Sequence, residues 1–107
     1  MEMDVQQTGD QLTGIIRFYS SLKFSVWSGP YTGLISRVGE VSVTAKEIAL
    51  IGPSDFGGSD VFTIDTWQSA LTAQQVKIAG QMTLTETYRN LFGPQVLAQT
   101  ADFEIKR

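Results

Sequence analysis

The segment Gly39–Ile64 reads GEVSVTAKEIALIGPSDFGGSDVFTI, and the segment Gly80–Ile105 reads GQMTLTETYRNLFGPQVLAQTADFEI. They align without a gap at a spacing of 41 residues, and seven of the 26 aligned positions are identical. The identical pairs are Gly39/Gly80, Thr44/Thr85, Leu50/Leu91, Gly52/Gly93, Pro53/Pro94, Phe62/Phe103 and Ile64/Ile105. This is either an internal duplication or two strand–turn–strand units with common turn chemistry, and both interpretations predict the same local structure.

Each segment opens with an alternating run, Val41–Val43 in the first and Met82–Leu84 in the second. A period of two is typical of a strand with one buried face. Each segment then reaches a Gly-Pro pair, which stops a regular element and turns the chain. The two units therefore share a strand at the start and a turn further on.

The residues between strand and turn have helical features in both units. Thr44 and Glu47 have the spacing of a capping box, and Gly52-Pro53 is a helix stop, which predicts a short helix over Thr44–Gly52. In the second unit Thr85 is a candidate cap, and Tyr88, Leu91 and Phe92 share one helical face. The alternative is that Ala45–Ile51 and Glu86–Phe92 continue as strands.

Outward from the two units, alternation and turn residues predict further strands. Leu22–Arg37 is expected to form a hairpin that turns at Ser28-Gly29-Pro30. Val61–Asp65 is expected to be a strand, followed by a helix over Thr66–Gln75 that Asp65 caps. Other predicted strands are Val76–Ile78, Val96–Ala98 and Asp102–Ile105.

These elements predict a β-rich α+β fold, with a mostly antiparallel sheet, two or three short helices and an internal repeat of about 41 residues. The alternative is an all-β barrel or sandwich. The length of 107 residues suits a single globular domain, 1–107, with repeat units 22–64 and 62–107.

Composition and charge exclude several classes of partner. The chain is 42% hydrophobic and carries a net charge of −3, with its eight basic residues scattered. Without a basic run we expect no nucleic-acid partner. The least charged stretch, Phe24–Ser36, is too short and too polar for a transmembrane segment. The localisation is unknown from the sequence, with the cytoplasm as the default.

The chain has no cysteine and no histidine. This excludes disulfides, thiolate metal sites, cysteine nucleophiles and every catalytic arrangement that depends on histidine. No glycine-rich phosphate motif is present. We therefore expect no cofactor and, on balance, no enzymatic activity. A histidine-independent enzyme that uses Asp with Lys or Tyr is the remaining catalytic hypothesis.

Acidic residues recur every five positions at Asp55, Asp60 and Asp65, around the glycine-rich stretch of the first unit. Asp55 and Asp60 are weak candidates for binding a hard cation, which needs several converging oxygen ligands. The alternative is local: Asx-turns at Asp55 and Asp60 and a helix cap at Asp65.

Aromatic residues suggest a second kind of site. Trp27, Tyr31, Phe56 and Trp67 are candidates for lining an apolar ligand pocket. The alternative is that they belong to the core, where tryptophan is commonly found.

The leading functional hypothesis is a non-catalytic binding or structural module that acts through its surface or through sheet edges. Its partner would be another protein or a second copy in a homo-oligomer, and the candidate edge strand is Asp102–Arg107. The alternative, from a different class, is a carrier of a small apolar, lipid-like ligand with the aromatic pocket just described.

Overall fold

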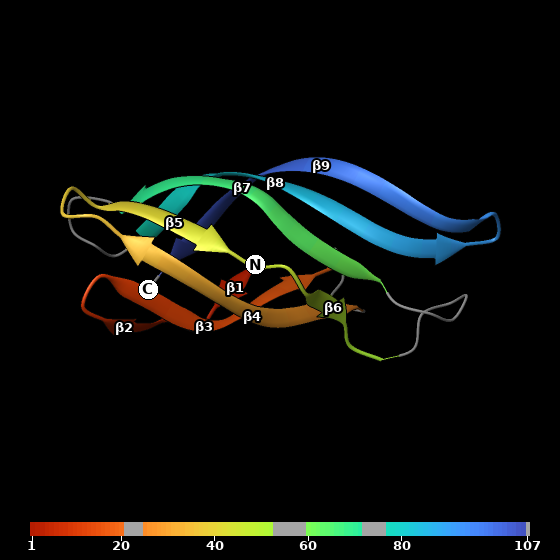
Figure 1. Ribbon diagram of the computed structural model, residues 1–107, viewed down its shortest axis with the longest axis horizontal. Helices are drawn as coiled ribbons and strands as arrows, with labels where there is room; N and C mark the ends of the chain where they lie inside the picture. Colours follow the sequence, from red (N-terminus) through yellow and green to blue (C-terminus); the bar gives the residue numbers. More distant parts are fainter. Residues whose placement is uncertain (21–24, 53–59, 72–76, 107) are drawn as a thin grey trace.

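The computed structural model describes residues 1–20, 25–52, 60–71 and 77–106, and every regular element in these ranges is a β-strand (Figure 1). The strands are β1 (Glu2–Met3), β2 (Gln6–Thr8), β3 (Gln11–Tyr19), β4 (Val26–Ile35), β5 (Glu40–Thr44), β6 (Ile48–Leu50), β7 (Val61–Leu71), β8 (Lys77–Asn90) and β9 (Gly93–Lys106). They form one antiparallel sheet in the order β1-β3-β4-β5-β7-β8-β9, with β2 on β3 and β6 on β4 and β7.

The prediction of an α+β fold is wrong, and the all-β alternative is confirmed. In the first unit β5 ends at Thr44, and β6 begins at Ile48 after a short irregular connection. Thr44 and Glu47 therefore do not form a capping box. In the second unit the chain continues as β8 through Asn90, so the helix predicted over Glu86–Phe92 is also absent.

The helix predicted over Thr66–Gln75 is absent as far as the described residues extend, because β7 runs through to Leu71. Asp65 does not cap a helix. It lies at an irregularity in the pairing between β7 and β8, where the register shifts between Ile64 and Thr66. Its carboxylate accepts a hydrogen bond of 2.5 Å from the Thr85 hydroxyl group, which ties the irregularity to β8.

The physical reason for these errors is the same in each case. A helix of two turns is marginal without tertiary packing. A strand at the same position gains backbone hydrogen bonds from neighbours that are distant in sequence, and threonine and aromatic residues suit a pleated surface. The expected hairpin around Ser28-Gly29-Pro30 is wrong for a related reason: these residues lie inside β4, which pairs with β3 from Val26 to Leu34.

The two aligned units share turn chemistry but not shape. Gly52 and Gly93 both adopt the left-handed backbone region, with φ of 98° and 95°. This conformation favours glycine because it lacks a Cβ atom. Gly52 follows the three-residue strand β6, whereas Gly93 closes the long hairpin of β8 and β9.

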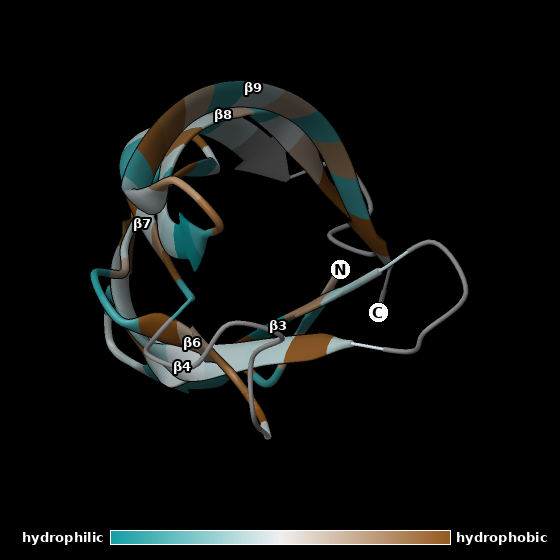
Figure 2. Cartoon of the chain, turned by 90° about the vertical axis from the view of Figure 1, so that its right-hand side faces the viewer, coloured by the Kyte–Doolittle hydropathy of each residue, from teal (hydrophilic) through white to brown (hydrophobic). Residues whose placement is uncertain are grey.

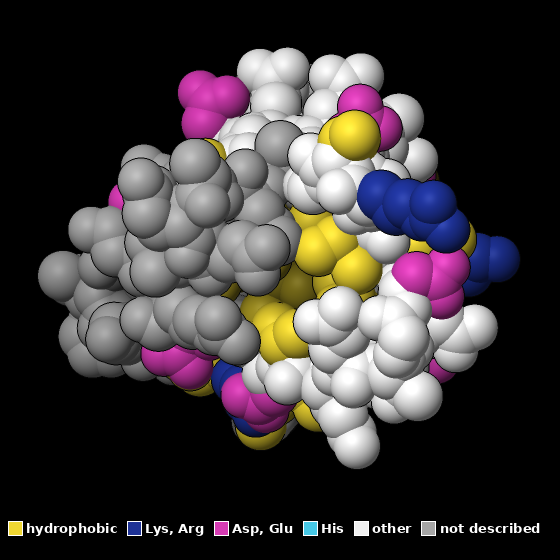
Figure 3. Space-filling model, turned by 90° about the vertical axis from the view of Figure 1, so that its left-hand side faces the viewer, with side chains coloured by type: hydrophobic (Ala, Val, Ile, Leu, Met, Phe, Trp, Pro, Cys, Tyr) yellow, Lys and Arg dark blue, Asp and Glu magenta, His cyan; other side chains and the backbone are white. Residues whose placement is uncertain are grey.

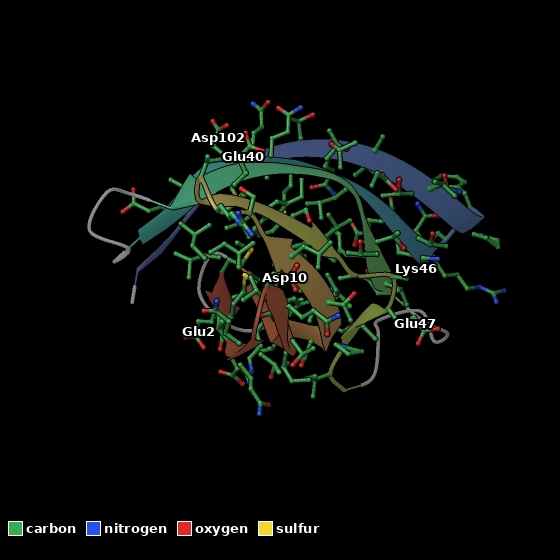
Figure 4. All side chains as sticks on the ribbon, turned by 60° about the vertical axis from the view of Figure 1, so that its left-hand side comes forward. Glu2, Asp10, Glu40, Lys46, Glu47 and Asp102 are labelled. Atoms are coloured by element: carbon green, nitrogen blue, oxygen red, sulfur yellow. The ribbon has the colours of Figure 1, made fainter. Side chains whose placement is uncertain are left out.

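The sheet curls so that one face of every long strand meets a common interior (Figure 2). Interior residues alternate along the strands, as with Met82 and Leu84 on β8. The buried hydrophobic residues are Leu12, Ile16, Tyr31, Val41, Val43, Ala45, Ile48, Ile64, Met82, Leu84 and Phe103. Figure 4 shows side chains filling the space between the curved halves, with Glu40 and Asp102 on the outside.

The short strand β1 is held against β3 by polar contacts. An Arg17 nitrogen lies 2.8 Å from an Asp4 carboxylate oxygen, and the Tyr19 hydroxyl donates to Glu2 at 2.9 Å. The buried Tyr31 side chain donates its hydroxyl to the backbone carbonyl of Asp4 at 2.7 Å. Tyr31 therefore fixes the start of the chain to the core.

Candidate functional site

The structure does not gather the predicted aromatic pocket into one place. Trp27 lies at the start of β4, Tyr31 is buried in the core, and Trp67 lies on β7 beside Phe103. Phe56 is outside the described residues. The described candidates are thus distributed along one core, where Trp27 and Trp67 make separate aromatic contacts.

Trp27 belongs to an aromatic cluster with Phe18 and Phe62. Its ring centroid lies 5.5 Å from that of Phe62 in an edge-to-face arrangement, and Phe18 makes the same contact with Phe62 at 5.5 Å. This geometry is favourable for aromatic pairs. The indole nitrogen of Trp27 is buried and has no hydrogen-bond partner among the described residues.

A carboxyl pair lies next to this cluster. Glu86 is directly opposite Phe62 in the register of β7 and β8, and its carboxyl group interacts with that of Asp60, which precedes β7. Burial, followed by the hydrogen bond and the charge of Asp60, raises the pKa of Glu86 to about 7. Gln99 acts in the opposite direction by donating its amide to Glu86 at 3.2 Å.

The sequence contains a signal for the position of Glu86. The alternation of Met82 and Leu84 continues to Glu86, which places a carboxyl group on the interior face of β8. Asp60 was singled out only as a weak metal ligand, and Asp55 lies outside the described residues. No group of three or more acidic residues suited to a metal ion occurs in the described ranges.

Trp67 has a different environment. The centroid of its ring lies 4.1 Å from that of Phe103, with an angle of 35° between the ring planes. Its indole nitrogen donates to the Ser69 hydroxyl at 2.6 Å. The Ser69 hydroxyl lies 3.3 Å from the Val41 carbonyl oxygen. Trp67 therefore has a satisfied polar atom and a packed ring.

The most exposed apolar surface lies on the hairpin of β8 and β9. Beyond the point where Thr87 pairs with Val61, the hairpin extends past β7, and no further strand of the described residues pairs with it there. We call residues 87–97 the arm. Leu91 is 81% exposed, Phe92 is 89% exposed and Val96 is 72% exposed.

The edge of β9 is a second feature of the same region. Among the described strands β9 pairs only with β8, although it is 14 residues long. From Gly93 to Ala101 it carries no charged side chain, and its acidic residues, Asp102 and Glu104, come later. The predicted edge strand Asp102–Arg107 corresponds to the last part of this strand as far as Lys106.

Several residues of this surface were assigned to the wrong environment by sequence reasoning. Leu91 and Phe92 were expected on the packed face of a helix, but the structure places them in the turn between β8 and β9. Asn90 accepts a hydrogen bond from the Phe92 amide at 2.8 Å, which is an Asx-turn and stabilises the reversal. The Asn90–Gly93 spacing was the available signal for a hairpin.

Comparison with known protein families, curated proteins and solved structures found no match. No helix in the described part of the chain is long and apolar enough to cross a membrane.

Proposed function

We propose that this chain is a non-catalytic protein-interaction module that binds another polypeptide by adding a strand to the edge of β9. The observation that supports the proposal is the combination of a 14-residue strand paired on one side and an arm with exposed apolar residues. A strand edge presents a row of backbone donors and acceptors that a second extended chain can satisfy.

The composition of β9 supports an edge that receives a partner. Natural proteins protect exposed edges with lysine, proline, bulges or inward-pointing charges. Between Gly93 and Ala101 the only such residue is Pro94, at the start of the strand, and the paired register from Asn90 to Lys106 has no shift. The edge is therefore regular and uncharged over most of its length.

Exposed apolar residues add specificity beyond the backbone. Val96 and Leu97 follow one another on β9 and point to opposite faces of the sheet, at 72% and 46% exposure. An added strand would therefore find an apolar side chain on each face of the sheet. Burying them would contribute favourably at about 25 cal/mol per Å² of apolar surface.

A peptide selection tests this function directly. A library of random peptides is selected against the wild-type protein, and the selected peptides are then measured against Val96→Lys and Val38→Lys. We expect Val96→Lys to weaken binding and Val38→Lys to preserve it, because Val38 is 81% exposed in the separate turn between β4 and β5. Equal binding to both variants would show that the peptides do not use the β9 edge.

The second candidate function is a carrier of a small apolar ligand. Figure 3 favours it, because hydrophobic side chains are visible at the bottom of a hollow at the left-hand end of the molecule. In Figure 1 the arrowhead of β7 lies at that end, and Trp67 lies on β7 four positions before its last residue. Trp67 is therefore the nearer tryptophan, since Trp27 lies at the opposite end of the sheet.

Two single-tryptophan proteins test the carrier function. Trp27→Phe retains Trp67 as the reporter, and Trp67→Phe retains Trp27. Titration with a long-chain fatty acid is expected to shift the fluorescence of the first protein and leave the second unchanged. A response confined to Trp27, or the absence of any response, would contradict a ligand at this end.

A further inference from the structure

We infer that the polypeptide received by β9 is a second copy of this chain, and that the two β9 strands pair antiparallel about a two-fold axis at Leu97. The inference rests on the proposed function, because it names the partner of the same edge. It follows from the register that the side chains of β9 can form with themselves.

A two-fold axis restricts the pairing. In a symmetric antiparallel pair, residues at equal distances on either side of the axis face each other. Opposed residues also point to the same face of the sheet. An axis at Leu97 therefore places Val96 opposite Ala98 of the second copy, and Gln95 opposite Gln99 of the second copy.

Within two residues of the axis, this register places side chains of similar kind opposite each other. Leu97, which is 46% exposed, meets itself, and Val96 meets alanine, so apolar surface is covered on both faces. The Gln95 and Gln99 amides, which are both half-buried, meet across the axis, where each offers donors and acceptors. An axis at Ala98 would instead oppose Leu97 with Gln99, and an axis at Val96 would oppose Leu97 with Gln95.

The charges of β9 favour the same arrangement. The uncharged stretch from Gly93 to Ala101 has Leu97 at its centre, so this axis pairs the stretch with itself from end to end. Asp102 then lies level with Phe92 of the second copy rather than with another carboxylate. A parallel in-register pair would place Asp102 and Glu104 beside the same residues of the second copy, which is unfavourable.

The absence of cysteine from the chain permits a direct test of the axis. Leu97→Cys places two thiols opposite each other, where Cα atoms of paired strands lie about 4.5–5.5 Å apart and a disulfide can form. Thr100→Cys is the control on the same strand. Its two copies would be six residues apart along the strand, or about 20 Å. We expect mild oxidation to link Leu97→Cys into a dimer and leave Thr100→Cys monomeric.

Sedimentation equilibrium provides the second measurement, and it uses wild type and two lysine variants that carry no introduced cysteine. Wild type and Val38→Lys are expected to dimerise alike, whereas Val96→Lys weakens the dimer by a factor of at least about ten, because each copy then carries on its edge strand a lysine, which opposes edge-to-edge pairing. Hydrogen exchange in β9 is expected to slow as the wild-type concentration rises. Equal dimerisation of all three proteins, or equal linkage at positions 97 and 100, would overturn the inference.

The two proposals can fail separately. A wild-type protein that stays monomeric, with no linkage through Leu97→Cys, rules out the second copy as the partner. If selected peptides still bind wild type and lose affinity for Val96→Lys, the β9 edge retains its proposed function with a different polypeptide. If the peptides bind Val96→Lys as tightly as wild type, the proposed function itself is rejected.

Discussion

The curled part of the sheet and the arm are both built from long antiparallel strands, but they differ in what their side chains meet. In the curled part Ile16 and Ile48 are fully buried by strands that come from several directions. In the arm Leu91 and Phe92 are 81% and 89% exposed. The comparison teaches that the hydrophobic pattern selects the strand, while the curl of the sheet decides which apolar residues become core.

The largest expected effect is a loss of stability when a side chain in the curled part, but not one in the arm, is truncated to alanine. Ile48→Ala removes a fully buried side chain and leaves a cavity, so we expect the free energy of unfolding to fall by about 3 kcal/mol. Leu91→Ala in the arm is expected to change it by less than about 0.5 kcal/mol. Urea denaturation followed by circular dichroism measures both. Similar losses would mean that the arm is packed in solution.

A slightly smaller loss of stability is expected when Gly80 is replaced, because β7 and β8 approach closely at this residue. A Cβ atom at this position would meet the backbone oxygen of Gln68 and the Ser69 backbone, neither of which can move without disturbing the sheet. We expect Gly80→Ala to cost about 2 kcal/mol, as overpacking does. The matched control is Gly52→Ala, where a Cβ atom meets nothing within 4 Å and only the left-handed backbone opposes the change.

The boundary between the two regions is expected to respond to pH through Glu86. Folding raises the pKa of Glu86 from 4.5 to about 7, so between these pH values the folded state retains a proton that the unfolded chain has released. The stability contribution of Glu86 therefore falls as pH rises from about 4.5 to about 7 and is constant above that range.

Glu86→Gln removes this dependence. At pH 8 the variant is expected to be more stable than wild type by about 1 kcal/mol, after the shift is reduced for solvent screening of a partly exposed group. Thermal unfolding at pH 4, 6 and 8 measures the trend, and the exposed Glu40→Gln controls for the loss of one negative charge. A wild-type advantage that grows above pH 7 would contradict the assignment.

The smallest expected effect concerns the turn of the arm. Phe92→Ser replaces a ring that is 89% exposed, and the Asx-turn from Asn90 uses the backbone amide of residue 92 rather than its side chain. We expect thermal stability to change by less than about 0.5 kcal/mol. A large loss would show that Phe92 packs against another molecule or another part of the chain.

Much of the strand pattern could be predicted, because period-two alternation at Val41–Val43 and Met82–Leu84 depends only on neighbouring residues. The helices were wrong because Thr44 and Thr85 have side chains that suit both a cap and a pleated sheet. Their pairing partners lie on other strands: Thr44 is opposite Thr32, and Thr85 is opposite Thr63. Local sequence does not reveal these partners.

The candidate sites show the same limit. The last part of β9 was predicted as an edge, but its full length from Gly93 depends on the hairpin at Asn90, which resembled the end of a helix. The carboxyl pair of Asp60 and Glu86 joins residues 26 positions apart, and only the pairing of β7 with β8 brings them together. The described aromatic candidates lie in or against one core, but no local pattern showed that Trp27 and Trp67 make separate aromatic contacts.

The order of the strands also has a consequence for folding. From β7 onward each strand pairs with the next one in the chain. The pairing of β8 with β9 can therefore start at their tight turn and extend along the hairpin without contacts to distant segments. Strands β3, β4 and β5 likewise pair in succession, whereas β7 must reach both β5 and β6. We therefore expect the docking of β7 on β5 to be the slowest pairing to form, and until β8 has been synthesised the free edge of β7 can pair with neighbouring chains.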